Sequence, residues 1–236
     1  ESAPGRIQLL TGPRQVGKTT LLLELARQWG SAAVYAPADG PEAGLPGFWE
    51  QLWARAQATA REHGQAVLLL DEIQHLSDWA QRLKAEWDRV RRRGTPLHVV
   101  ATRSSALRLG AGSRERLTGR FERIVLAHWS ARDLAETFGL ARDEALDAVV
   151  SEGAYPGGVA LRSDPARWAA YVRDAIVEPA LGRDLLALGA VRRPGLLRQV
   201  FAAAAALPAE IVSLQKLRGL LHDPGALETT AHYLGL

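Results

Sequence analysis

The stretch that decides the fold is "LLTGPRQVGKTTLLLELAR", residues 9–27. An apolar run leads into a loop bounded by Gly12 and Gly17, after which Lys18 opens a segment with apolar residues at helical spacing. The spacing Gly-x-x-x-x-Gly-Lys-Thr lets backbone N–H groups surround a phosphate chain, to which the lysine adds a positive charge. The stretch therefore predicts a strand, a phosphate-binding loop and a helix, in that order.

A second motif follows about fifty residues later, where "AVLLL" at residues 66–70 precedes Asp71 and Glu72. This run is too short for a buried helix and is apolar on both faces, as an interior parallel strand should be. P-loop NTPases place carboxylates at the end of such a strand to hold magnesium. The two motifs together predict a site for ATP and Mg²⁺ at the carboxyl ends of two strands.

Each residue of the two motifs has an expected task. We expect Lys18 to reach the β and γ phosphates, Thr19 to ligate Mg²⁺ through its hydroxyl, and Asp71 to hold that ion through a water. Glu72 is expected to orient and deprotonate the attacking water. The predicted nucleotide-binding residues are Gly12, Pro13, Arg14, Gln15, Val16, Gly17, Lys18, Thr19 and Thr20. Arg14 fits phosphate or solvent equally, and Thr20 fits the α-phosphate or the sheet.

Two further groups of residues are candidates near the γ-phosphate. The strand that contains "LHVVAT" ends in Thr102, and either Thr102 or Ser104 has the place of a γ-phosphate sensor. The residues from Thr102 to Ser105, Ser105 above all, could instead cap the next helix. Residues 101–123 carry six arginines and two glutamates, a balance that suits phosphates. Among them, Arg120, with Arg116 as a second candidate, fits an arginine finger that completes a neighbour's site, or a solvated loop. The predicted catalytic set is Glu72, Lys18, Arg120 and Thr102.

The order of elements predicts an α/β fold, a parallel sheet with helices on both faces and the ligand at the carboxyl ends of the strands. We expect residues 1–127 to form this P-loop ATPase domain and residues 128–207, where strands disappear, to form a helical lid. Residues 208–236 fit the start of a winged helix or three short lid helices, with a turn at residues 223–225.

Finer patterns give local predictions. They are a helix from an N-cap at Ser77 to Arg93, a continuous helix over residues 165–182, a helix over residues 184–190, a turn within "EGAYPGG" at residues 152–158, and two short helices before residue 223.

Composition narrows the class of protein. The 236 residues include no cysteine, which excludes disulfides and thiolate metal sites, and the six histidines lack metal-ligand spacing. The apolar runs fall far short of the roughly 20 residues of a membrane helix, and no signal peptide is visible. We therefore expect a cytoplasmic protein with no membrane partner. Because the chain begins at Glu1 and ends within a helical pattern, we also expect it to be a piece of a longer protein.

The motifs resemble those of a group of prokaryotic AAA+ ATPases, AAA domain family fourteen, relatives of the archaeal ATPase group. The resemblance rests on "TGPRQVGKTTLL", "LLLDEIQHL", "ATRSSALRL", "LTGRFERIVLAHWSARDL" and "EGAYPGG". It implies ATP with Mg²⁺, a helical lid and a winged-helix-like module, often followed by a nuclease-like domain. Arg103 stands where the family has glycine.

These observations favour one function and leave two alternatives. The favoured one is Mg-dependent ATP hydrolysis that couples nucleotide state to a nucleic acid or protein partner, in a homo-oligomer if Arg120 acts on a neighbour. The first alternative is a slow nucleotide-dependent switch or binding module with little intrinsic turnover. A nucleoside kinase is weaker because "LDEIQ" is not a kinase signature. The chain lacks a guanine-reading "NKxD", which favours ATP over GTP.

Overall fold

The computed structural model describes residues 5–104, 117, 119–184 and 193–222. Its elements group into two compact units, Glu1–Trp168 and Ala169–Leu236. The predicted domain boundaries after residues 127 and 207 stay predictions. Within the described residues, none of the helices combines the length and the apolar character needed to cross a bilayer.

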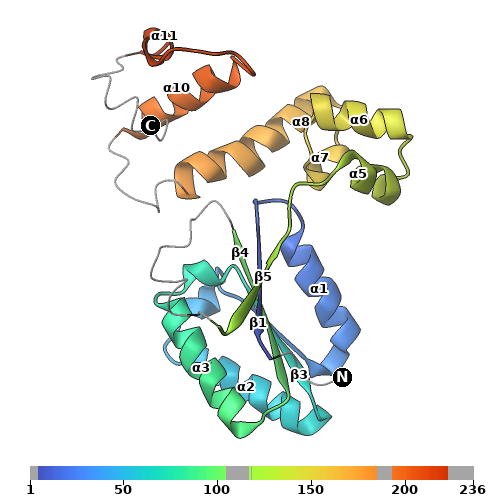
Figure 1. The fold of residues 1–236 in the computed structure, drawn as a ribbon, viewed down its shortest axis with the longest axis vertical. Helices are drawn as coiled ribbons and strands as arrows, with labels where there is room; N and C mark the ends of the chain where they lie inside the picture. The colour runs from blue at the N-terminus through green and yellow to red at the C-terminus, as the bar shows by residue number, and fades with distance from the viewer. Residues whose placement is uncertain (1–4, 105–116, 118, 185–192, 223–236) are drawn as a thin grey trace. The chain divides into compact units, whose positions relative to one another are not determined.

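The first unit contains a five-stranded sheet in which every pairing is parallel (Figure 1). Its strands are β1 (Ile7–Gly12), β2 (Ala33–Pro37), β3 (Ala66–Asp71), β4 (Leu97–Ser104) and β5 (Phe121–Val125). They lie in the order β2-β3-β4-β1-β5. The parallel sheet confirms the predicted α/β fold class. Parallel strands need crossover connections, and helices supply them here.

Helices cover both faces of this sheet. They are α1 (Lys18–Trp29), α2 (Phe48–His63) and α3 (Trp79–Arg93). Helix α1 packs with Leu22 on Val67 and Leu69, whereas α2 and α3 pack on the opposite face, where Leu68 and Leu70 lie (Figure 1). The alternation arises because successive residues of a strand point to opposite faces. Every residue of β3 is buried, so truncating one of its leucines to alanine should cost about 2–5 kcal/mol.

The register of the sheet places three strand ends side by side. Gly12 at the end of β1 pairs with Ser104 at the end of β4, and β4 pairs on its other side with β3, which ends at Asp71. Carboxyl ends of neighbouring parallel strands share one edge of a sheet. The two sequence motifs therefore meet at this edge although about fifty residues separate them.

After β5, the described elements of the first unit are helices. Its elements are α5 (Ala131–Phe138), α6 (Arg142–Ser151), α7 (Pro156–Val159) and α8 (Pro165–Tyr171), which runs on into the second unit. A capping box opens α5, because the Ser130 side chain accepts from the Asp133 N–H and the Asp133 carboxylate accepts from the Ser130 N–H. Leu134, Ala145 and Val159 form the core of this helical part.

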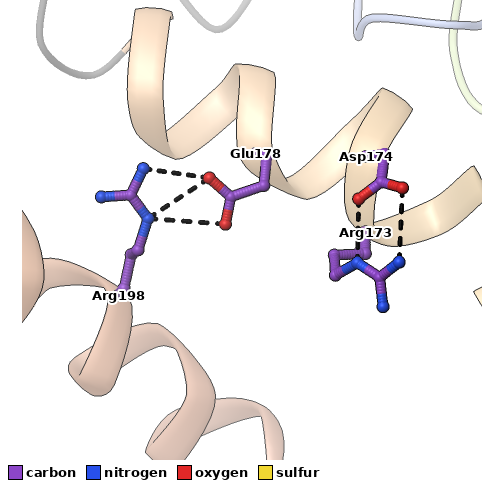
Figure 2. Close-up of polar contacts among 4 residues, drawn as sticks. All are labelled: Arg173, Asp174, Glu178 and Arg198. Atoms are coloured by element: carbon purple, nitrogen blue, oxygen red, sulfur yellow. Dashed lines mark hydrogen bonds and ion pairs between the residues drawn. The ribbon is translucent and has the colours of Figure 1, made fainter. Parts of the chain in front are cut away.

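The second unit continues with π-helical turns at Val172–Val177 and Ala180–Asp184, followed by α10 (Pro194–Ala205) and α11 (Leu214–Gly219). Glu178 accepts hydrogen bonds from Arg198 of α10, at 2.9 Å for the closest pair of atoms, and Arg173 pairs with Asp174 (Figure 2). The Glu178–Arg198 pair joins two segments of this unit. Each of these side chains is substantially exposed, so the pairs orient the segments more than they stabilise them.

Several local predictions were wrong. Helix α3 begins at Trp79 after Asp78, not after an N-cap at Ser77, because Asp78 is left-handed at φ 50° and its carbonyl accepts the first helical bond, from Arg82. The segment predicted as one helix over residues 165–182 passes into π-helical turns. The predicted turn at residues 152–158 contains the short helix α7, which Pro156 starts.

The last correction concerns residues 208–222, where the sequence predicts two short helices. Only α11 is helical in this segment. Ala209 interrupts the helical backbone with a left-handed φ of 60°. The helix α11 then starts after its N-cap Ser213, whose hydroxyl accepts a hydrogen bond from the Lys216 N–H. The predicted turn at residues 223–225, the third helix after it and the helix at residues 184–190 lie outside the described residues, apart from Asp184.

Candidate nucleotide site

The phosphate loop joins β1 to α1 at the carboxyl edge of the sheet. Gly12 is required there because a Cβ atom at this position would lie 2.2 Å from the carbonyl oxygen of Leu126. That approach is fixed by a backbone hydrogen bond of 2.7 Å from the Leu126 N–H to the Thr11 carbonyl. The chain after β5 therefore runs close along the start of the loop, and only glycine fits between them.

Lys18 is the first residue of α1, and it is 4% exposed. Its ammonium donates to the carbonyl oxygens of Pro13, at 2.7 Å, and Gly12, at 3.2 Å. A buried ammonium needs hydrogen-bond acceptors, and here the loop itself provides two. The lysine charge is thus held inside the loop, where a phosphate group would also meet it.

The bend of the loop depends on two left-handed residues. Gln15 has a φ of 61° and Gly17 a φ of 96°. They lie on either side of Val16, which is 1% exposed. This bend brings the chain into α1, whose first N–H groups have no partner within the helix and give its start a partial positive charge. A helix start of this kind attracts anions.

Asp71 ends β3 in a buried position, at 4% exposure. Its Oδ1 accepts a short hydrogen bond from the hydroxyl of Thr102, and its Oδ2 accepts one of 3.1 Å from the hydroxyl of Tyr35 on β2. Burial, together with the Asp71 charge, raises the pKa of Tyr35 to about 12. The Tyr35 hydroxyl therefore stays protonated at neutral pH and remains a donor to the carboxylate.

Glu72 follows directly and turns the chain with a φ of 50°. Its N–H donates to the Thr102 hydroxyl oxygen at 2.9 Å, and its carboxylate accepts from the Ser104 hydroxyl at 3.0 and 3.1 Å. The side-chain amide of Gln74 also donates to this carboxylate. Thr102 is fully buried and connects both acidic residues, so one hydroxyl fixes the relative positions of Asp71 and Glu72.

Arg120 lies at the amino ends of the strands, whereas the site lies at their carboxyl ends. Its carbonyl accepts from the N–H of Ile7, the first residue of β1, whereas the phosphate loop follows the last. Six strand residues span roughly 17–20 Å. The guanidinium donates to Asp88 at 2.8 and 3.2 Å, and this hydrogen bond holds the pKa of Asp88 below its usual value. Arg120 therefore does not reach its own chain's site.

A pocket of about 810 Å³ adjoins the loop. Its walls come from the loop, from α1, from the segment after β5 and from α5 and α7; they include Gln15, Val16, Gly17, Thr20, Leu21, Leu126, His128, Trp129, Asp133 and Pro156. The lining is more apolar than polar, as in small-molecule sites generally. Its volume and its place beside Gly17 suit a nucleoside whose phosphates lie in the loop. Tyr155 packs edge-on against His128, with ring centres 5.1 Å apart.

The predicted site residues fall into three groups. Among the loop residues, Gln15, Val16, Gly17 and Thr20 line the pocket, and Thr20 is exposed. Asp71, Glu72 and Thr102 form one hydrogen-bonded group with Ser104. Arg120 stands apart from both. Arg116 lies outside the described residues.

Sequence reasoning missed three residues that the structure adds. Tyr35 contacts Asp71, Gln74 contacts Glu72, and Trp129 donates through its indole to the carbonyl of Val16 at 3.1 Å. Gln74 could have been noticed, since it lies two residues from Glu72. Tyr35 lies 36 residues from its partner and Trp129 lies 113 from its own, so no local pattern pointed to either.

The candidate oxygen ligands for a magnesium ion are the hydroxyl of Thr19 and the carboxylate of Asp71. They are the hard donors that Mg²⁺ prefers, and a phosphate-bound Mg²⁺ needs only one or two protein ligands because it keeps several waters. In the described part of the chain, no group of three or more His, Cys, Asp or Glu side chains could hold a metal ion by itself. The donor set fits an ion that arrives with a nucleotide.

A parallel sheet with a glycine-bounded loop, a buried lysine and a strand-end acidic pair defines a P-loop nucleotide-binding protein. The model of one family, described as an AAA domain, matches residues 4–135. The chain belongs to this AAA domain family of P-loop ATPases, and the suspected family resemblance is confirmed at that level.

A solved structure reported as "Structural Basis for Katanin Self-Assembly" is 17% identical, with a TM-score of 0.45, and the alignment covers 99% of this chain and 79% of that one. No curated protein matches the chain.

Proposed function

We propose that this chain binds ATP with Mg²⁺ at the carboxyl ends of β1, β3 and β4 and hydrolyses it. The observation that supports this most directly is the hydrogen-bonded group of Asp71, Thr102 and Glu72 beside a loop that holds Lys18. A carboxylate for a cation, a carboxylate for a water and a buried ammonium for phosphate are the groups that phosphoryl transfer to water requires.

In this proposal the triphosphate occupies the loop and the start of α1. The backbone N–H groups of that start bind phosphate oxygens, and the Lys18 ammonium exchanges its contacts with the loop carbonyls of Gly12 and Pro13 for contacts with phosphate. The nucleoside extends into the adjoining pocket, whose lining includes Leu21 and Pro156. Apolar walls on this side suit a planar base.

Thr19 and Asp71 would hold Mg²⁺. When bound, the ion neutralises charge that develops on the phosphate oxygens. Asp71 is well placed for an outer role, because its two oxygens already accept hydrogen bonds from Thr102 and Tyr35 and each oxygen keeps a lone pair for a water. The two hydroxyls hold the carboxylate in one orientation, which reduces the freedom that binding must remove.

Glu72 acts as general base on the attacking water. Its carboxylate is fixed on one side by the Ser104 hydroxyl and the Gln74 amide, and its backbone by Thr102. Fixing the base keeps its free oxygen lone pairs in one direction, where they can accept a proton from a water next to the γ-phosphate. Thr102 then contributes by placing Glu72, while direct contact of Thr102 or Ser104 with the γ-phosphate stays a prediction.

The change from ATP to ADP is proposed to act on a nucleic acid or protein partner through the helical part after β5. Arg120 is proposed to serve the site of a neighbouring copy in a homo-oligomer, since it lies at the far edge of its own sheet. That role would require Arg120 to leave or share its ion pair with Asp88. The cytoplasm, where ATP is abundant, is the proposed location.

One observation favours a second candidate function, a slow nucleotide-dependent switch. Both carboxylate oxygens of Glu72 accept hydrogen bonds from Ser104, and Gln74 adds another. These donors occupy lone pairs of the carboxylate that an attacking water would otherwise reach. Binding would then be strong while turnover waits for a partner that releases Glu72.

The test measures ATP binding by calorimetry and phosphate release for the wild type, Glu72→Gln and, as a matched control, Glu62→Gln, an exposed glutamate near the end of α2. We expect Glu72→Gln to bind ATP and to lose about 10²–10⁴-fold in turnover, the contribution of a general base. Glu62→Gln should match the wild type. Absence of binding heat with Mg·ATP in the wild type would refute the proposed function.

Turnover across protein concentrations, with and without DNA, separates the two candidates. The ATPase is favoured if turnover rises with concentration and is lost in Arg120→Ala. Asp88→Ala breaks the same ion pair but keeps the arginine, so it should retain turnover if Arg120 acts on a neighbour. Tight binding with negligible turnover at all concentrations supports the switch.

A further inference from the structure

Trp129 is hydrogen-bonded to the phosphate loop, although it is not among the site residues that the sequence predicts. Trp129 follows β5, and its indole N–H donates to the carbonyl oxygen of Val16 at 3.1 Å. Val16 is the residue before Gly17, and it is 1% exposed. The hydrogen bond therefore ends on the backbone of the loop itself, and only Gly17 separates Val16 from the start of α1.

The tryptophan ring belongs to the helical part of the first unit. It packs against the cluster around Leu134 of α5, and its ring lies 6.1 Å from that of Phe138. A packed indole has a fixed position, so its N–H is held in one direction. Trp129 thus connects the core of the helices after β5 to one peptide group of the loop.

The peptide group between Val16 and Gly17 is planar and trans, so its carbonyl and its N–H point in opposite directions. Fixing the Val16 carbonyl on the Trp129 side therefore aims the Gly17 N–H away from Trp129. Gln15 and Gly17, on either side, both have left-handed backbones at φ 61° and 96°. A bend that contains a left-handed glutamine persists only where neighbouring groups hold it.

We propose that Trp129 is a positioning residue that holds the phosphate loop in its binding conformation through the Val16 carbonyl. This inference rests on the proposed function, because it assigns a role in phosphate binding. Loss of the indole N–H would allow the loop to sample other bends, and affinity falls in proportion to the fraction of loops that remain competent. Trp129 also lines the pocket, so a ligand that never enters the pocket is needed to isolate its action on the loop.

Inorganic tripolyphosphate with Mg²⁺ is that ligand, since it has no base or sugar. Its affinity is measured by calorimetry for the wild type, Trp129→Phe and Trp29→Phe. Trp29 is a matched control, because it lies at the other end of α1, where its ring packs at a tilt against that of His98. We expect Trp129→Phe to bind tripolyphosphate roughly threefold to tenfold more weakly, the range for one lost hydrogen bond, and Trp29→Phe to match the wild type.

A purely structural role for Trp129 would lower the melting temperature and leave tripolyphosphate affinity unchanged; that result overturns the inference. If Trp129→Phe does not fold, benzothienylalanine at position 129 keeps the bicyclic shape and replaces the N–H by sulfur. Equal affinity for tripolyphosphate in this variant and the wild type also overturns it. A wild type that binds neither tripolyphosphate nor ATP refutes the proposed function itself, whereas a binding wild type with an unaffected variant refutes only the role of Trp129.

Discussion

Replacing Thr102 by valine removes the hydroxyl that joins the two acidic residues and keeps the shape of the side chain. Thr102 is completely buried, donates to the Asp71 carboxylate and accepts from the Glu72 N–H at 2.9 Å. A hydrogen bond to a charged group contributes about 1.5–3 kcal/mol and a neutral one about 1 kcal/mol. Thr102→Val should therefore lower the free energy of unfolding by about 2.5–4 kcal/mol.

The measurement is thermal unfolding followed by circular dichroism at neutral pH. For a chain of this length, about 1 kcal/mol corresponds to about 2–4 °C, so the midpoint should fall by roughly 5–15 °C. Thr102→Ser is the control, because it keeps the hydroxyl and loses only a methyl group, at a cost of about 1 kcal/mol. Thr102→Val should also hydrolyse ATP more slowly, because the Glu72 N–H then loses its hydrogen-bond acceptor.

Two results would refute this reasoning. One is a Thr102→Val midpoint within about 2 °C of the wild type, which would mean that the hydroxyl contributes less than about 1 kcal/mol. The other is a serine variant as unstable as the valine variant, because the loss would then come from packing and not from the hydrogen bonds.

Three further predictions concern other parts of the molecule. Gly12→Ala places a Cβ atom 2.2 Å from the Leu126 carbonyl oxygen, so the loop or the chain after β5 must shift, and we expect a clear drop in both melting temperature and ATP affinity. The hydrogen bond from Arg120 lowers the folded-state pKa of Asp88 below 3.8, so the pair stabilises the fold at pH values above about 4 and this contribution is lost as the pH falls through the lowered pKa. Urea titrations of wild type and Asp88→Asn should therefore differ at pH 7, and the difference should shrink as the pH is lowered below about 4; a difference that stays constant would contradict the assignment. Tyr35→Phe removes one donor to Asp71 and should change the magnesium concentration that half-saturates ATP hydrolysis while leaving tripolyphosphate binding without metal intact; the reverse pattern would show that Tyr35 acts on the loop.

The local chemistry of the site could be predicted from the sequence. Gly12, Gly17 and Lys18 lie within seven consecutive residues, and the buried run before Asp71 identifies a strand end without any other information. Both signals are short-range, because each depends on backbone conformation and burial of one segment. The bounds of helix α2 are likewise set locally, by its apolar period and by Gly47 and Gly64 on either side of it.

The wrong predictions of helix start and helix type arise because the local sequence does not determine these backbone conformations. A serine is a good cap in isolation, so the sequence predicts the start of α3 at Ser77, whereas in the structure the left-handed Asp78 precedes the buried Trp79 at which the helix begins. The π-helical turns after α8 have the same apolar residues as an ordinary helix, so no sequence period distinguishes them.

The sequence by itself determined a phosphate-binding loop, an acidic strand end and a parallel sheet, because these depend on residues adjacent in the chain and on the burial of short apolar runs. Only the tertiary structure decided which side chains hold them: Tyr35 on Asp71, Trp129 on Val16, and Arg120 far from its own site. Strand order and register bring such residues together across tens of residues of chain, and no local pattern encodes that order.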